Sequence, residues 1–311
     1  MKRRCVVAAF GIILVVAGTA WSDLRVGLMP AYNSIPLVVA EMDGLFEAEG
    51  VKVELLPFSS QLNRETALQA GAIDGTVSDM INAIQAWSRG FGARVTSASE
   101  GNFSLLAAPG SGLRTLDDWK RRAPGRIRTG LLENSIVYYL TERMLISAGA
   151  DTAAIELVPI LQLPARLEML IAGQIEAATL PEPLATVAEA RGAHRLADAE
   201  ALGPTPGVLL FTKKALADKG REISAFYRAY DRAVAAVNAD PESYRQAIVD
   251  RCEFPPAVTR LMRIPRFHAA FVPEPAEVAA VATWMLAKGL VPAAPAYDEI
   301  VSPGFLRAGN R

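Results

Sequence analysis

Cysteine and histidine are scarce in this chain of 311 residues, which contains two of each. Neither His194 nor His268 stands at a spacing typical of metal ligands, so a zinc or iron site is not expected. Cys5 lies in an amino-terminal segment that we expect to be removed. Cys252 then remains as the single cysteine, which excludes an intrachain disulfide. Packing must therefore stabilise the folded chain.

The sequence also lacks an excess of charge of one sign. It has 32 Lys and Arg against 33 Asp and Glu, a formal net charge of −1. No basic face for nucleic acid or an anionic membrane is expected from this balance. Hydrophobic residues make up 51% of the chain, and a chain of this length buries a large core and often divides into two lobes.

Patterns typical of enzymes are missing as well. No Gly-x-Ser-x-Gly elbow occurs, and the spacing of residues suggests no grouping of Ser, His and Asp. Gly90 and Gly92 form part of a dinucleotide fingerprint, but they follow a predicted helix instead of a strand, so we interpret them as a turn. We expect no cofactor and no catalytic residue.

The amino terminus has the pattern of a secretory signal peptide. Three basic residues at 2–4 precede an apolar run at 5–17, and small residues follow. The run is shorter than the roughly 20 residues of a spanning helix, so an uncleaved anchor is the weaker interpretation. We expect residues 1–22 to be removed by cleavage near 20–22, which gives a soluble periplasmic protein. Without the basic residues at 2–4, 29 Lys and Arg face 33 Asp and Glu, a net charge of −4.

The stretch that follows predicts a strand, a loop, a helix and a second strand. Residues 24–29 are apolar, residues 36–46 place apolar side chains at helical spacing, and residues 51–58 alternate as a strand does. Two strands joined through a helix run parallel, by a right-handed crossover. Ligands bind beyond the carboxyl ends of such strands, so the loop at 30–36 is the first candidate contact surface.

A second series of the same design begins near residue 127. The segment 173–179 repeats the pattern of 70–76, in which a helix end and a glycine lead into a short strand with an acidic residue. Glycine- and proline-rich breaks near 109 and 203 separate this series from the rest. We therefore expect an α/β protein with a discontinuous first lobe and a cleft. The expected lobes are 23–108 with 203–311, and 109–202.

The order of these motifs is similar to that of a known family, the solute-binding proteins of ABC importers in the nitrate, sulfonate and taurine (SsuA/THI5-like, NMT1) group. The opening resembles theirs through Pro36, Ala40, Gly44-Leu45-Phe46 and Gly50-Val51, and the second lobe through Gly173, Glu176, Ala177, Ala178 and Glu182-Pro183. The chain departs from the group's pattern at Glu176, where Asp is usual. Segments 229–230, 238–241 and 297–306 also resemble the group's carboxyl-terminal half.

The resemblance implies a bilobed, periplasmic-binding-protein-like (type II) fold with a two-segment hinge. It implies that a small solute is captured between the lobes and delivered to a membrane permease, with the protein acting as a monomer. Two alternatives stay open. One is a biosynthetic enzyme of the same fold, similar to the thiamine-pyrimidine (THI5-like) synthases or to some menaquinone-pathway enzymes. The former carry a cysteine-rich motif that one mature cysteine cannot match. The other is a ligand-sensing protein for a sensor kinase, which would use the same cleft.

Candidate contact residues lie in five loops that precede helix starts. Helix amino termini offer unpaired N–H groups and a partial positive charge, so small polar ligands bind there readily. Serine at such positions also serves simply as a helix cap. The candidates are Tyr32, Asn33, Ser34, Ser59, Ser60, Ser78, Asp79, Glu133, Asn134, Ser135 and Glu182.

The charges near these loops indicate the type of ligand. Asp79, Glu133 and Glu182 are acidic, whereas Arg64 and Arg166 fall inside predicted helices, about a turn beyond their starts. A bare oxyanion would usually be bound by Arg or by several N–H donors. We therefore expect an amino-bearing or heteroaromatic solute, such as a thiamine pyrimidine precursor. A taurine-like zwitterion or an alkanesulfonate is the second choice.

Overall fold

The computed structural model describes residues 24–306, apart from 100, 123 and 125. The expected signal peptide, residues 1–22, lies outside this part of the chain. Among the described residues, no helix is both long enough and apolar enough to cross a bilayer.

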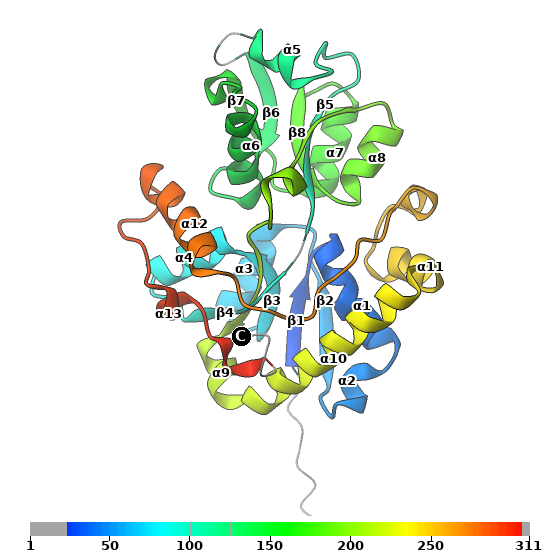
Figure 1. The fold of residues 1–311 in the computed structure, drawn as a ribbon, viewed down its shortest axis with the longest axis vertical. Coiled ribbons are helices and arrows are strands. Elements are labelled where there is room, and N and C mark those ends of the chain that lie inside the picture. Colours follow the sequence, from blue (N-terminus) through cyan, green and yellow to red (C-terminus); the bar gives the residue numbers. More distant parts are fainter. Residues whose placement is uncertain (1–23, 100, 123, 125, 307–311) are drawn as a thin grey trace, which may run out of the picture.

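Two five-stranded sheets, each packed with helices, form two lobes (Figure 1). The first sheet has the order β2-β1-β3-β10-β4 and the second has the order β7-β6-β8-β5-β9. The strands of the first sheet are β1 Leu24–Leu28, β2 Val53–Pro57, β3 Gly75–Asp79, β4 Ala93–Ala98 and β10 Gly207–Thr212. Those of the second are β5 Phe103–Ala107, β6 Ile127–Leu131, β7 Ile155–Pro159, β8 Ala177–Pro181 and β9 His194–Asp198. The predicted α/β, bilobed fold class is confirmed.

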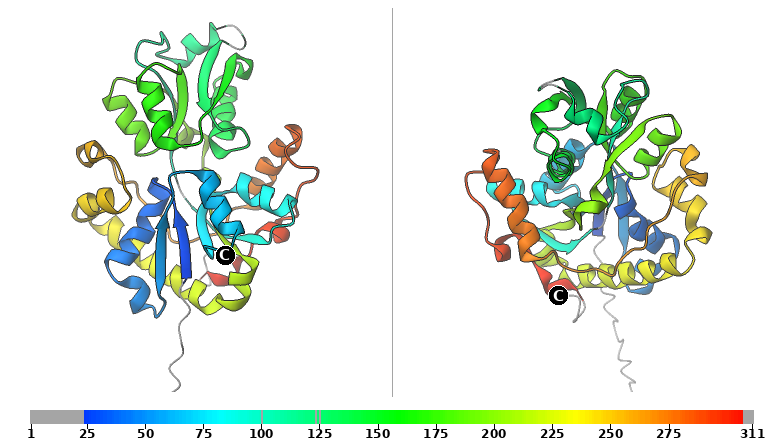
Figure 2. Two further views of the ribbon diagram at one scale, coloured as in Figure 1. Left: turned by 180° about the vertical axis from the view of Figure 1, so that it is seen from behind. Right: turned by 45° about the horizontal axis from the view of Figure 1, so that its top comes forward.

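Most of the helices belong to the first lobe, which also receives the last third of the chain (Figures 1 and 2). Its helices are α1 Ile35–Met42, α2 Leu45–Ala48, α3 Gln61–Gln69, α4 Met80–Ser88, α9 Lys213–Asp218, α10 Gly220–Ala239, α11 Pro241–Arg251, α12 Pro275–Ala287 and α13 Tyr297–Ile300. The second lobe has α5 Leu116–Lys120, α6 Ile136–Ser147, α7 Leu163–Ile171 and α8 Leu184–Ala190. Short 3-10 turns are η1 Tyr32–Ser34, η2 Thr152–Ala154, η3 Ala199–Leu202, η4 Pro256–Arg260 and η5 Pro303–Phe305.

The helix expected at 36–46 is two helices, because the chain turns at Gly44. Gly44 has a φ of +62°, a left-handed conformation that glycine adopts at little cost. Helix α1 therefore ends at Met42 and α2 begins at Leu45.

The two lobes repeat one unit, as the sequence pattern predicted. In the first lobe β1 pairs in parallel with β2 and β3, and in the second lobe β6 pairs in parallel with β7 and β8. Helices α1 and α3 make the crossovers of the first unit, and α6 and α7 make those of the second. In each sheet one strand, β10 or β5, runs antiparallel to its neighbours. The carboxyl ends of both sets of parallel strands therefore have helix starts beside them.

The expected boundary near residue 109 is wrong. Strand β5 belongs to the second sheet, where Leu105 pairs with Thr179 of β8 and with Ala197 of β9. The chain thus first crosses between the lobes at 99–102, and the break at 109–112 is a loop inside the second lobe. A largely apolar, buried strand such as this one fits the middle of either sheet, so its composition does not reveal which sheet it joins. The second crossing follows η3, which packs against α6 and β5 of the second lobe, and leads into β10 of the first sheet.

Gly75 provides a test of this packing, since it pairs with Phe211 in the contact between β3 and β10. A Cβ atom at Gly75 would lie 2.7 Å from the Leu210 carbonyl oxygen, closer than real Cβ atoms pack. We expect Gly75→Ala to lower the free energy of unfolding by about 1–3 kcal/mol in guanidinium titrations. Gly304→Ala is the control, because nothing lies within 4 Å of its added Cβ. Equal stability of the two variants would contradict this account of β3.

Candidate functional site

A pocket lies between the two lobes, at the carboxyl ends of the parallel strands. It encloses about 690 Å³, part of which is open to solvent. The first lobe supplies residues that follow β1, residues of α3 and the end of β3, and the second lobe supplies residues from α6, α7 and the end of β8. Gly101 and Thr205 come from the two segments that cross between the lobes, and Gly207 begins β10. Both lobes and both crossings thus meet at one site.

Asp79 is the acidic group of the pocket. It ends β3 and caps α4, and its carboxylate accepts hydrogen bonds from the Asn82 backbone N–H at 3.0 Å and the Asn82 side-chain amide at 2.8 Å. The side chain is buried, and burial raises the pKa of Asp79 from its ordinary 3.8 to about 6, although nearby Arg64 opposes this rise. A carboxylate in such surroundings binds a cationic or N–H group readily.

Arg64, on α3, is the first of two buried arginines in the pocket wall. Its Nη2 atom lies 2.7 Å from Glu65 Oε1 and 3.0 Å from Ser78 Oγ. Ser78 in turn donates a hydrogen bond to the same Glu65 oxygen at 3.1 Å. The charge of Arg64 is thus balanced by a carboxylate of its own lobe.

Arg166, on α7, is the second buried arginine, and its surroundings differ. It is 2% exposed, and it donates to the carbonyl oxygens of Thr179 at 3.2 Å and Ile160 at 2.7 Å. Its Nε–H has no acceptor, and no carboxylate pairs with it among the residues that the structure describes. Burial lowers the pKa of Arg166 to about 10, so the guanidinium is still protonated at neutral pH. It is a buried cation in the pocket wall that has no ion-pair partner among the described residues.

Asn33 is the complementary group on the first lobe. It lies in η1, directly after β1, and its Oδ1 atom is buried without a hydrogen-bond donor. The wall between these polar groups is apolar and includes Met29, Phe103, Ile136 and Leu163. The pocket wall therefore contains a buried, unpaired acceptor from one lobe and a buried, unpaired cationic donor from the other.

Three of the predicted contact residues, Asn33, Ser78 and Asp79, line this pocket. Asn33 lies in η1 after β1, and Ser78 and Asp79 are the last two residues of β3, 45 residues or more further along the chain. All three are therefore near the carboxyl ends of parallel strands of the first sheet.

Three predicted serines have structural roles instead. Ser34 is buried and donates to the Met29 carbonyl oxygen at 2.7 Å, and Ser135 caps α6 by accepting from the Tyr138 backbone N–H. Ser60 forms a backbone bridge with Gln162, which joins the start of α3 to the start of α7 across the lobes. Of the three, Ser135 alone caps its helix with its side chain, as serine at a helix start often does.

Ser59 and Glu133 are exposed, and neither lines the pocket. Asn134 follows Glu133 in a left-handed conformation, with a φ of +61°. Its carbonyl oxygen accepts a hydrogen bond from Gln85 Nε2 of the first lobe at 3.3 Å, and its own Oδ1 is buried without a donor. Asn134 thus lies at the contact between the lobes, outside the pocket wall.

Tyr32 also lies outside the pocket wall, although it touches the lobe interface. Its ring packs edge-on against Phe254, with ring centroids 6.4 Å apart. Its backbone N–H donates to the Glu182 carbonyl oxygen of the second lobe at 3.3 Å.

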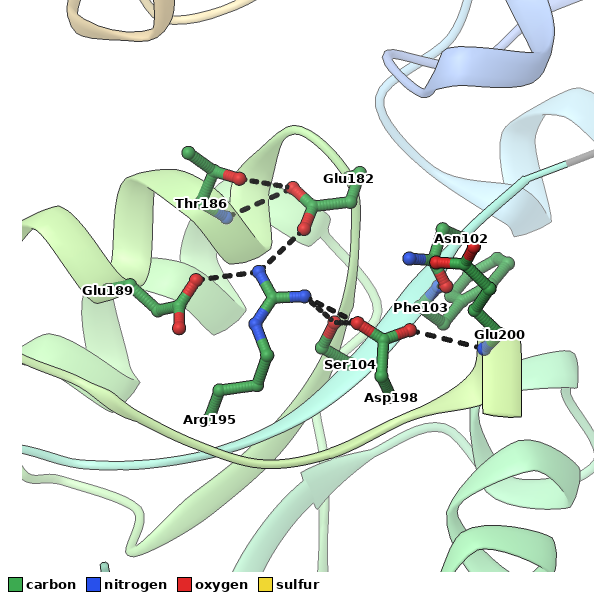
Figure 3. Close-up of polar contacts among 9 residues, drawn as sticks. All are labelled: Asn102, Phe103, Ser104, Glu182, Thr186, Glu189, Arg195, Asp198 and Glu200. Atoms are coloured by element: carbon green, nitrogen blue, oxygen red, sulfur yellow. Dashed lines mark hydrogen bonds and ion pairs between the residues drawn. The ribbon is translucent and has the colours of Figure 1, made fainter. Parts of the chain in front are cut away.

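Glu182 is held in a charged network instead of facing the pocket (Figure 3). Its Oε1 atom lies 2.7 Å from Arg195 Nη2, and its Oε2 atom accepts from the Thr186 hydroxyl at 2.8 Å and from the Thr186 N–H at 3.1 Å. Arg195 also pairs with Glu189 at 2.6 Å and Asp198 at 2.7 Å. Both oxygens of Glu182 are therefore occupied by its own lobe.

Sequence reasoning undervalued Arg64 and Arg166 because both lie inside helices. A signal for them was available in the internal repeat. Each is the fourth residue of its helix, in α3 and α7, which are equivalent crossovers of the two lobes. Residues at equivalent positions of two lobes that face each other reach the shared pocket from opposite sides.

Asp79 gives a pH-dependent prediction. A raised pKa means that Asp79 binds its proton more tightly in the folded state than in the unfolded state. Protonation of Asp79 therefore stabilises the fold below about pH 4, and this stabilisation is lost as the pH rises through about 6. Asn at this position keeps the cap and carries no charge. We expect the stability of Asp79→Asn relative to the natural protein to grow by up to about 3 kcal/mol between pH 4 and pH 7. Urea unfolding at several pH values measures this.

The exposed carboxylate of Glu133 gives the control for that experiment. Glu133→Gln removes an exposed carboxylate outside the pocket, and its stability is measured at the same pH values. A stability difference for Asp79→Asn that varies with pH no more than that for Glu133→Gln would contradict the burial of a charged Asp79.

Glu182 gives a second prediction, about stability. Glu182→Ala leaves the Thr186 N–H and part of the Arg195 guanidinium without an acceptor, so we expect the free energy of unfolding to fall by about 1–3 kcal/mol. Glu182→Gln keeps a hydrogen-bond acceptor, so its free energy of unfolding should fall by less. Glu133→Ala should leave the melting temperature unchanged. A melting temperature unchanged in Glu182→Ala would mean that the network contributes nothing.

The fold and the pocket define a class, that of bilobed α/β proteins which bind a small solute between two lobes. The chain belongs to the NMT1/THI5-like family, whose model matches residues 31–244. A relative from Brachyspira hyodysenteriae, named as a putative ABC transporter periplasmic binding protein, is 26% identical over 249 residues, which cover 74% of this chain and 69% of that protein. The chain is accordingly a solute-binding protein of the ABC-importer type and not an enzyme.

Solved structures share the fold at lower identity. The ligand-binding component of an ABC-type import system from Staphylococcus aureus, with zinc bound, has a TM-score of 0.77 at 18% identity and covers 91% of this chain and 97% of its own. The aliphatic sulphonate-binding protein SsuA from Escherichia coli has a TM-score of 0.71 at 21% identity, covering 90% and 97%. The nitrate-binding protein NrtA from Synechocystis has a TM-score of 0.73 at 12% identity, and the match covers 92% of this chain and 87% of that chain. No cluster of metal-ligating side chains occurs among the described residues of this chain.

Proposed function

We propose that this protein is the extracytoplasmic binding component of an ABC importer. It captures a small organic solute between its lobes and delivers it to a membrane permease, as a monomer in the periplasm. The family, the name of the Brachyspira relative and the signal-like amino terminus support this proposal. The pocket supports it too, because it takes groups from both lobes and from both crossing segments, so a bound solute favours the closed arrangement.

Arg166 is the observation that indicates the chemical class of the solute. A buried charge without a partner is costly, and a counterion supplied by the ligand removes that cost. Its Nε–H is unpaired, whereas its two terminal nitrogens are held by carbonyl oxygens. The unpaired donor of a guanidinium makes strong hydrogen bonds to sulfonate, carboxylate or phosphate oxygens. The solute therefore carries an acidic group that binds Arg166.

The opposite side of the pocket indicates a second group on the solute. Asn33 Oδ1 lacks a donor, and the buried carboxylate of Asp79 lines the same pocket. Both atoms accept hydrogen bonds, so an amine or another N–H group satisfies them. The apolar wall between the two sides fits a hydrocarbon body and leaves a bare inorganic oxyanion poorly matched. This favours an amino-bearing organic acid, such as an aminosulfonate, over an uncharged heteroaromatic amine.

The proposal is tested by thermal shift with compounds in which the acid, the amine and the apolar body are varied one at a time. The panel includes taurine, ethanesulfonate, an aminopyrimidine and nitrate, with longer aminosulfonates and aminocarboxylates. Bound solute raises the melting temperature by mass action. We expect compounds with both acid and amine to give the largest shifts, and calorimetry on the best of them to give the dissociation constant.

Variants of Arg166 decide the role of the acid group. We expect Arg166→Gln to weaken the best acidic compound about 10- to 100-fold, because a charge-assisted hydrogen bond is lost. Arg191→Gln is the matched control, since Arg191 pairs with Glu168 at the surface of the second lobe. A best compound without an acidic group, bound equally well by Arg166→Gln, would overturn the assignment.

A further inference from the structure

Helix α12 links the two lobes at a place away from the pocket. It belongs to the first lobe, where it packs against α4 through buried residues such as Val278, Val281 and Met285. Figure 1 shows α12, in orange, at the side of the first lobe below the second. One turn at its end, Trp284 to Lys288, contacts helix α6 of the second lobe.

Glu142 of α6 is the polar centre of this contact. Its side chain is only 6% exposed, yet both of its carboxylate oxygens are bonded by groups of the first lobe. Oε2 accepts from Trp284 Nε1 at 2.8 Å, and Oε1 lies 2.6 Å from Lys288 Nζ. A carboxylate that is buried in the closed arrangement thus depends on α12 for its partners, and separation of the lobes would break both bonds at once.

Aromatic rings surround this ion pair. The Trp284 ring meets Tyr139 edge-on, with centroids 5.2 Å apart, and meets Tyr138 in the same way at 6.0 Å. The Lys288 ammonium also lies over the Tyr138 ring, 5.3 Å from its centroid. Edge-to-face rings and a cation over a ring are both attractive geometries. All of these contacts cross from one lobe to the other.

We propose that Trp284 and Lys288 form a latch that holds the second lobe closed before any solute has bound. Glu142, Trp284 and Lys288 do not line the pocket, so they are positioning residues and not contact residues. The apparent affinity of a ligand falls in proportion to the fraction of protein in its binding-competent state. By keeping that fraction high, the latch raises the affinity for any solute that the pocket accepts. This inference does not depend on which solute that is.

The latch is tested without ligand, by the distance between spin labels on the two lobes. Labels are placed at the exposed positions Asn63 of α3 and Glu156 of β7, each changed to Cys. Cys252 does not compete for the label because it is buried, and burial raises the pKa of its thiol to about 12.

The protein is unfolded in guanidinium and refolded before measurement, which removes bound solute. We expect a dominant short distance in the natural sequence. In Trp284→Ala, we expect the ratio of closed to open populations to fall about tenfold.

Two further variants keep the test decisive. Lys288→Met changes an exposed side chain, so it reports on the latch even if Trp284→Ala does not fold. It should shift the distances in the same direction. Glu168→Gln is the matched control, because it breaks an ion pair with Arg191 inside the second lobe and should leave the distances unchanged. Distances that stay the same in Trp284→Ala and Lys288→Met, or that shift equally in Glu168→Gln, would overturn the proposal.

Discussion

The buried guanidinium of Arg166 is the constraint on which this account of the molecule depends. Its two terminal nitrogens donate to the carbonyl oxygens of Thr179 and Ile160, and its buried Nε–H has no acceptor. Burying an ion costs several kcal/mol when no opposite charge accompanies it. The unpaired charge of Arg166 therefore destabilises the empty closed form, and an acidic solute removes this destabilisation. Binding energy and lobe closure are linked through this one group, because the solute must also touch the first lobe to be enclosed.

The two lobes present groups of different charge to the pocket. Equivalent positions on α3 and α7 carry Arg64 and Arg166, yet only Arg64 has a carboxylate of its own lobe beside it. The first lobe thus presents acceptors, Asn33 and Asp79, while the second lobe presents a net positive group. The same repeated unit gives opposite polarity on the two walls. Contacts outside the pocket, from Ser60 with Gln162 to the α12 latch, complete the closed arrangement.

Much of the fold could be predicted from sequence because the signals were local. Alternation, helical spacing and glycine at helix ends located the parallel units of both lobes, and the second break located the return to the first sheet. Strand β5 was misplaced, since an apolar segment fits the centre of either sheet and its partners are about 75 to 90 residues away. Three predicted residues line the pocket, Asn33 in η1 and Ser78 and Asp79 at the end of β3, because the sequence pattern located the ends of these strands. Glu182 lies outside the pocket wall because it pairs with Arg195 of β9, and the arginines were not predicted because their long side chains reach the pocket from within helices.

A crystal structure with the best-binding solute tests the central claim most directly. The account predicts an acidic oxygen of the solute within hydrogen-bonding distance of Arg166 Nε, about 2.7–3.2 Å, with an N–H group of the same molecule directed at Asn33 or Asp79. A solute bound in the pocket with no acidic atom near Arg166 would contradict it.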